Sequence, residues 1–140
     1  MSKAMNSASS KPVPKPTPET QPFWDGCAQG ELRLQHCDDC QHVQYPARKL
    51  CSGCFSENVS WHTASGRGKV LSWSIVVAPG ALGFADEVPF ISVIIALDEG
   101  PTMLSVLRDC EAEQMTFDMT VEVVFEQRSE SIFVPYFKPV

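Results

Sequence analysis

Hydrophobic and polar positions alternate with a period of two along most of the chain after Gly66. Successive side chains of a strand point to opposite faces of a sheet, so this period predicts strands and not helices. The predicted strands lie at residues 71–77, 91–97, 102–108, 121–126 and 131–137. Five short strands in succession predict a small β-barrel, with a sandwich fragment as the competing architecture.

The connections between these strands favour one type of barrel. The stretch DEGP, residues 98–101, is typical of a tight hairpin between the second and third strands. The longer stretch RDCEAEQMTFDM, residues 108–119, can hold a helical turn between the third and fourth strands. A five-stranded OB barrel often carries a helix at this place, so we expect residues 65–140 to form an OB-fold.

The region before the barrel shows a different pattern. Phe23, Trp24 and Cys27 can share one face of a short helix that ends at Gly30. The alternation of Leu32 and Leu34 with polar residues then predicts a strand. Residues 23–36 are therefore expected to form an N-terminal helix and the first strand of a small sheet, and further short strands are expected at HVQYP and NVSWHT.

Residues 1–22 are rich in Ser, Pro, Thr and Lys and contain few large hydrophobic side chains. They cannot bury enough surface to offset the entropy of ordering, so we expect a disordered tail. The tail lacks the hydrophobic centre of a secretory signal peptide, and no stretch of the chain approaches the roughly 18 uninterrupted apolar residues that would span a bilayer. We therefore expect a cytoplasmic protein without a membrane partner.

The formal net charge of −6 is unevenly distributed. The tail carries +2, whereas the remaining residues carry −8. Binding to a nucleic acid backbone depends largely on Lys and Arg, so this charge speaks against a nucleic acid partner.

Four of the six cysteines form two C-x2-C pairs that are separated by ten residues, Cys37 with Cys40 and Cys51 with Cys54. In a reducing compartment, paired motifs of this kind bind metal more often than they form disulfides. Each motif places two sulfurs on one tight turn, and two turns complete the tetrahedral shell of Zn²⁺. We expect residues 37–64 to form a zinc ribbon with a structural Zn²⁺, because four thiolates leave no position for a reactive water.

Alternatives to this site remain open. Four thiolates also suit iron, and electron transfer would then be the function. Thiol–disulfide exchange is disfavoured because neither pair stands at the start of a helix in a βαβ unit. His36, His42 and His62 lie near the motif but are not needed as ligands, and Cys27 and Cys110 are expected to be free thiols.

Motifs of known catalytic sites are absent from the sequence, which contains no G-x-S-x-G, Walker A or dinucleotide-binding glycine motif. Arg67 and Lys69, in the stretch SGRGK, could contact a phosphate, although a turn before the first barrel strand explains the stretch equally well. The loop PGALGFADEVPF, residues 79–90, contains Leu82 and Phe84 and is either local core or a partner surface.

Taken together, this order of segments resembles the DUF35 family. The matching stretches are FWDG, LRLQHCDDCQHVQYPARKLCSGC, SGRGKVLSWSIVV, PFISVIIALDEG and MTVEVVFE. The resemblance covers residues 23 to 138 and implies an N-terminal helix, a rubredoxin-like zinc ribbon with ligands Cys37, Cys40, Cys51 and Cys54, and an OB-fold.

The resemblance also implies a function. Members of the family typically act as non-catalytic accessory subunits that bind a thiolase-like enzyme in acyl-CoA cleavage or condensation. Phe23, Trp24, Leu82 and Phe84 would then be candidates for the partner interface, and Arg67 and Lys69 for contacts with the phosphates of CoA. A nucleic-acid-binding module and an independent acyl-CoA binder are the alternative functions.

Overall fold

The computed structural model describes residues 11–78 and 83–140 of the chain. A single α-helix of the described residues, α2 (Gln21–Ala28), precedes a small three-stranded sheet. The strands of this sheet are β1 (Arg33–Cys37), β2 (Val43–Gln44) and β3 (Val59–Thr63). Their order is β2-β1-β3, and both neighbours pair with β1 in antiparallel register. The expected short ribbon strands are confirmed.

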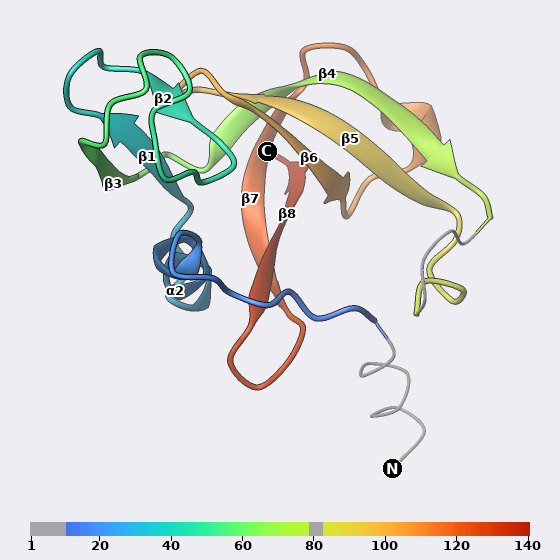
Figure 1. The fold of residues 1–140 in the computed structure, drawn as a ribbon. Coiled ribbons are helices and arrows are strands. Elements are labelled where there is room, and N and C mark those ends of the chain that lie inside the picture. The colour runs from blue at the N-terminus through green and yellow to red at the C-terminus, as the bar shows by residue number, and fades with distance from the viewer. Residues whose placement is uncertain (1–10, 79–82) are drawn as a thin grey trace.

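The second half of the chain forms a closed barrel with the strand order β4-β5-β6-β8-β7 (Figure 1). Its strands are β4 (Arg67–Val76), β5 (Phe90–Leu97), β6 (Thr102–Leu107), β7 (Thr120–Gln127) and β8 (Phe133–Pro139). The first strand pairs with both β5 and β7, which closes the sheet on itself. A 3-10 turn, η1 (Ala112–Gln114), lies between β6 and β7 as expected. The predicted mainly β fold with an OB barrel is confirmed, and the sandwich fragment is excluded.

One hydrophobic core joins the barrel to the ribbon and the helix. Alternate residues of β5 point inward and are buried, namely Ile91, Val93, Ile95 and Leu97. The same cluster of buried side chains includes Phe23 and Cys27 of α2 and the ribbon residues Leu32 and Leu34. Because the core is continuous, the ribbon and the barrel support one another by apolar burial.

The alternation expected along β4 fails at Leu71. The register with β5 shifts between Val70 and Ser72, which is the signature of a β-bulge. Val70 is fully buried, whereas Leu71 is 43% exposed. An extra residue in one strand turns the following side chains to the opposite face, so Leu71 does not belong to the core although the sequence pattern places it there.

The helix begins earlier than the sequence predicts. Residues 17–20 form a turn in which the backbone N–H of Thr17 donates to Oγ1 of Thr20, and α2 starts at Gln21, inside the segment expected to be a tail. The guanidinium of Arg128 also donates to the carbonyl of Pro12 at 3.1 Å. Disorder of residues 1–22 in solution stays a prediction. Within the described residues, no helix combines the length and apolar character needed to cross a membrane.

Candidate metal centre and neighbouring surfaces

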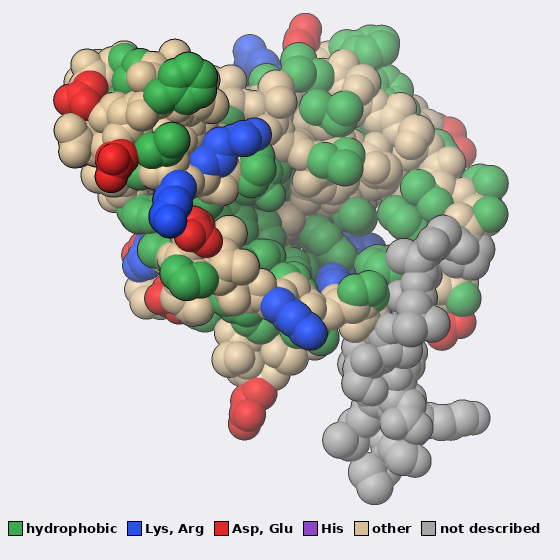
Figure 2. Space-filling model, in the orientation of Figure 1, with side chains coloured by type: hydrophobic (Ala, Val, Ile, Leu, Met, Phe, Trp, Pro, Cys, Tyr) green, Lys and Arg blue, Asp and Glu red, His purple; other side chains and the backbone are tan. Residues whose placement is uncertain are grey.

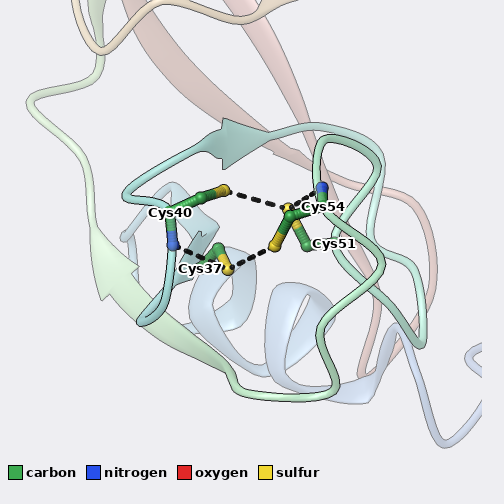
Figure 3. Close-up of side chains that lie close together, drawn as sticks. All are labelled: Cys37, Cys40, Cys51 and Cys54. Carbon is green, nitrogen blue, oxygen red and sulfur yellow. Dashed lines mark hydrogen bonds between the residues drawn. The ribbon is translucent and has the colours of Figure 1, made fainter.

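The four ribbon cysteines lie on two turns of the same geometry (Figure 3). In the first turn, the N–H of Cys40 donates to Sγ of Cys37, and the N–H of Gln41 donates to the Cys37 carbonyl at 3.0 Å. In the second turn, the N–H of Cys54 donates to Sγ of Cys51. The N–H of the following residue, Phe55, donates to the Cys51 carbonyl at 2.9 Å. These local bonds aim the paired sulfurs of each turn at those of the other turn.

The distances between the sulfurs fit one tetrahedral Zn²⁺. Sγ of Cys37 lies 3.6 Å from Sγ of Cys54, Sγ of Cys40 lies 3.5 Å from Sγ of Cys51, and all four sulfurs lie within 4.8 Å of one another. Zn–S bonds of about 2.3 Å in a tetrahedron require S···S distances of about 3.8 Å. The donor set therefore fits a structural zinc ion bound by four thiolates, with no coordination position left for water.

Backbone donors favour the thiolate form at Cys51. At Cys40 and Cys54 the backbone donors are outweighed by burial and by the neighbouring thiols, which compete for the same charge, so the pKa of Cys40 and the pKa of Cys54 are raised. Burial opposes ionisation of Cys51, but the N–H groups of Cys54 and Gly53 and the neighbouring thiols outweigh it and lower the pKa of Cys51 to about 6. The N–H of Gly53 donates to its Sγ at 3.2 Å. The fixed donors therefore stabilise a charged sulfur at Cys51.

A pair of buried glutamines holds the loop that leads to the second turn. The side chain of Gln35 donates to the Arg48 carbonyl at 2.9 Å and accepts from the Arg48 N–H at 2.8 Å. The side chain of Gln44 donates to the Leu50 carbonyl at 3.2 Å and accepts from the N–H of Ser52 at 2.8 Å. The sequence did not predict this network, because the pairing of Gln35 with Gln44 across β1 and β2 appears only in the folded chain.

The three histidines are not part of the sulfur cluster. The rings of His36 and His62 stack with their centroids 4.0 Å apart. Burial and the neighbouring His62 lower the pKa of His36. Nε2 of His42 lies 3.1 Å from the hydroxyl oxygen of Ser52, within hydrogen-bonding distance. The group of candidate ligands found among the described residues contains the four cysteines and no histidine.

Arg67 and Lys69 lie on the first barrel strand with exposed side chains. The guanidinium of Arg67 is 4.0 Å from the carboxylate of Glu122, which also lies 3.9 Å from the ammonium of Lys138. Arg67 therefore already has an acidic neighbour. A contact of Arg67 and Lys69 with phosphates of CoA stays a prediction.

The structure describes three of the four residues proposed for a partner interface, and they lie in different surroundings. Phe23 is only 6% exposed and packs edge-on against Trp24, with ring centroids 5.0 Å apart, so Phe23 belongs to the core. Trp24 is partly buried against the same cluster. Phe84 packs against Phe90 with ring centroids 5.8 Å apart. The segment at residues 83–89, which precedes β5, lies away from α2 (Figure 1). Leu82 lies outside the described residues.

Phe84 takes part in a cluster of charged and aromatic residues. The ammonium of Lys11 lies 5.2 Å from the centroid of the Phe84 ring and forms an ion pair with Glu87. Arg108 binds Glu87 at 3.0 Å and Glu126 at 2.7 Å. A cavity of about 310 Å³ adjoins this cluster and is lined by residues that include Ile75, Phe90, Leu107, Arg108 and Cys110. These ion pairs connect the segment before β5, the end of β6 and strand β7.

The fold and the sulfur site together define a rubredoxin-like zinc ribbon joined to an OB barrel. Two family models match this division, the ChsH2 rubredoxin-like zinc ribbon domain at residues 24–60 and the ChsH2 C-terminal OB-fold domain at residues 61–126. The chain belongs to the DUF35 family.

Known relatives carry two kinds of name. A DUF35 domain-containing scaffold protein of Pyrococcus furiosus is 39% identical over 83 residues, which are 59% of this chain and 60% of that protein. The alpha subunit of 3-oxo-4,17-pregnadiene-20-carboxyl-CoA hydratase of Mycobacterium tuberculosis is 30% identical over 80% of this chain and 35% of its own length. The chain therefore spans less than two thirds of the length of both relatives.

A solved structure has the same fold. The structure described as Ltp2-ChsH2(DUF35) aldolase superposes with a TM-score of 0.80, and the alignment covers 90% of this chain and 98% of the solved chain. The sequence identity is 22%, so this similarity concerns the fold alone.

Proposed function

We propose that this chain is a non-catalytic accessory subunit that binds a thiolase-superfamily enzyme and supports cleavage or formation of carbon–carbon bonds in acyl-CoA substrates. The observation that carries the proposal is the closed set of four sulfurs, within 4.8 Å of one another, in the candidate metal centre of this DUF35 protein. A zinc ion held by four thiolates crosslinks the two turns and has no free position at which to bind substrate. The reaction is therefore assigned to a partner.

The names of the relatives support the assignment of a non-catalytic role to this chain and of the reaction to a partner. The Pyrococcus relative is named a scaffold protein, the Mycobacterium relative is named the alpha subunit of a carboxyl-CoA hydratase, and the structural neighbour is named an aldolase together with Ltp2. In such a complex the zinc ribbon and the barrel would act as one body, because Leu32 and Leu34 share a core with the barrel strands. The subunit would then present its ribbon and barrel surfaces to the partner enzyme in a fixed relative orientation.

Co-purification from the source organism tests the proposal. The full-length chain, tagged at one end, should elute from size-exclusion chromatography together with an acyl-CoA enzyme, at a mass larger than either protein alone. Adding the zinc-loaded chain to that enzyme should increase its activity on an acyl-CoA substrate. Separate elution and unchanged activity would contradict the proposal. Calorimetry of the isolated chain with a CoA thioester tests the alternative of an independent acyl-CoA binder.

A further inference from the structure

The second cysteine turn ends in an exposed aromatic side chain at a position that favours glycine. Phe55 follows Cys54 and has a φ angle of +64°, in the left-handed region that bulky residues rarely adopt. Gln41 follows Cys40 in the first turn and has a φ angle of +66°. Both turns require a left-handed backbone at this position. A glycine would adopt this conformation without strain, so a phenylalanine here does not stabilise the turn.

The Phe55 side chain also makes few packing contacts with the rest of the fold. Its side chain is 76% exposed. Phe117 is exposed to a similar degree, but its ring packs against Trp73 with centroids 4.8 Å apart. Among the described residues, no aromatic ring makes a comparable contact with Phe55. A large apolar side chain that is both strained and exposed indicates a contact outside the chain.

The surroundings of Phe55 give this surface its chemical character. A groove of about 430 Å³ is lined by Arg48, Leu50, Cys51, Ser52 and Phe55, and Leu50 is 40% exposed. Lys49, which is exposed, lies between Arg48 and Leu50 in the same loop. We call Arg48, Lys49, Leu50 and Phe55 the ribbon patch. Over the ribbon, Figure 2 shows hydrophobic side chains beside Lys and Arg side chains.

The ribbon patch is basic in an otherwise acidic fold. Residues 23–140 carry a formal charge of −8, and none of the ion pairs found in the described part of the chain involves Arg48 or Lys49. A complementary partner surface would combine an apolar pocket with Asp or Glu side chains at its rim. The charge of the fold disfavours a nucleic acid at this place.

The loop that carries Arg48, Lys49 and Leu50 of the ribbon patch is held in place before any partner binds. Gln35 and Gln44 are buried and pair with the backbone of Arg48, Leu50 and Ser52. Residues fixed in this way lose little conformational entropy on association, which favours affinity.

We propose that the ribbon patch is a docking site for the enzyme subunit of the complex, with Phe55 inserted in an apolar pocket whose rim is acidic. This inference rests on the proposed function, because it takes the acyl-CoA enzyme as the occupant. It places the principal contact on the zinc ribbon, whereas the sequence suggested α2 and the loop at residues 79–90.

A pair of matched glycine variants tests the docking site. Phe55→Gly and Gln41→Gly both relieve the left-handed strain, so both should keep one zinc per chain and a melting temperature at or above that of the wild type. Calorimetry should be done with the full-length zinc-loaded chain and the acyl-CoA enzyme that co-purifies with it. We expect Phe55→Gly to raise the Kd about 30-fold, as for an aromatic hot spot, and Gln41→Gly to change it less than twofold.

A charge variant tests the electrostatic part. Lys49→Glu should raise the Kd about tenfold at low salt and reduce the salt dependence of binding, whereas Lys15→Glu, in the N-terminal segment, should do neither. If the wild type binds the enzyme and Phe55→Gly binds it equally well, the docking site is wrong and the proposed function stands. If the wild type binds no acyl-CoA enzyme, both are wrong.

Discussion

Nε2 of Gln44 donates a hydrogen bond of 2.7 Å to Oε1 of Gln35, and both side chains are buried on the paired strands β1 and β2. The side chains of this pair form four further hydrogen bonds with the backbone of Arg48, Leu50 and Ser52, in the loop after β2 and at the start of the second cysteine turn. The two glutamines therefore support the segment that carries the metal ligand Cys51 and three residues of the ribbon patch, namely Arg48, Lys49 and Leu50.

Loss of this pair should destabilise the ribbon. Gln44→Leu leaves the partly buried Leu50 carbonyl and Ser52 N–H without their partners, where a fully buried group without a partner costs about 1 to 3 kcal/mol. We expect the free energy of unfolding to fall by about 2 to 4 kcal/mol. Denaturation with urea, followed by Trp fluorescence, measures it. The control Gln127→Leu, at an exposed position, should change stability by less than about 0.5 kcal/mol, and an equally small effect of Gln44→Leu would contradict the prediction.

Removal of a sulfur ligand should abolish the metal site. Cys40→Ser takes one of the four converging thiolates away, and because binding of structural zinc is itself a contribution to folding, we expect the ribbon to unfold or the protein to aggregate. Elemental analysis should find about one zinc per chain in the wild type and a strongly reduced content in the variant. Cys110→Ser, which removes a thiol outside the cluster, should keep the metal. Full zinc content in Cys40→Ser would argue against a four-thiolate site.

The free thiols should differ in reactivity. Burial raises the pKa of Cys27 to about 12, and only 1% of its surface is exposed, so alkylation at pH 8 should leave it untouched. Burial and the charge of Glu111 also raise the pKa of Cys110, which is partly exposed. The thiolate fraction grows as the pH rises, so labelling of Cys110 should accelerate from pH 7 to pH 9.

Mass spectrometry of the iodoacetamide-treated, zinc-loaded protein can follow this difference. One modification per chain, absent from Cys110→Ser, is the expected result, and a chelator should expose four further thiols. Rapid modification of Cys27 in the folded protein would contradict the prediction that this thiol is inaccessible to the reagent.

Arg108 should contribute more to stability than Arg67. Its guanidinium forms two hydrogen bonds with Glu126, of 2.7 and 3.1 Å, and lies 4.6 Å from the centre of the Tyr136 ring. Lysine cannot reproduce this planar, bidentate geometry, so Arg108→Lys should lower the free energy of unfolding by about 1 kcal/mol. Arg67→Lys, at a pair 4.0 Å apart and largely in solvent, should have no measurable effect. Thermal denaturation at two salt concentrations can compare them, and equal effects would contradict the prediction.

The metal centre could be predicted almost completely from the sequence. The two C-x2-C motifs each form one local turn, and the hydrogen bonds from Cys40 and Cys54 back to the first sulfur of each motif span only three residues. The strands of the barrel were predicted for the same reason, since a period of two is a property of neighbouring residues. The exception is the bulge after Val70, where one additional residue reverses the faces of β4.

The surfaces, in contrast, depended on contacts between distant parts of the chain. The sequence suggested Phe23 as a surface residue of a partner interface. In the structure, Phe23 is buried in the core that also contains Leu32 and barrel side chains. Gln35 reaches Arg48 across 13 positions, and nothing local to either residue predicts that pair.

The sequence by itself therefore determined the elements and the metal ligands, because short-range spacing and periodicity are sufficient to specify them. Only the tertiary structure decided which apolar side chains remain exposed, and it left Phe55 in solvent while it buried Phe23. Exposure is set by the packing of segments far apart in the chain, so it becomes visible only when the whole chain is folded.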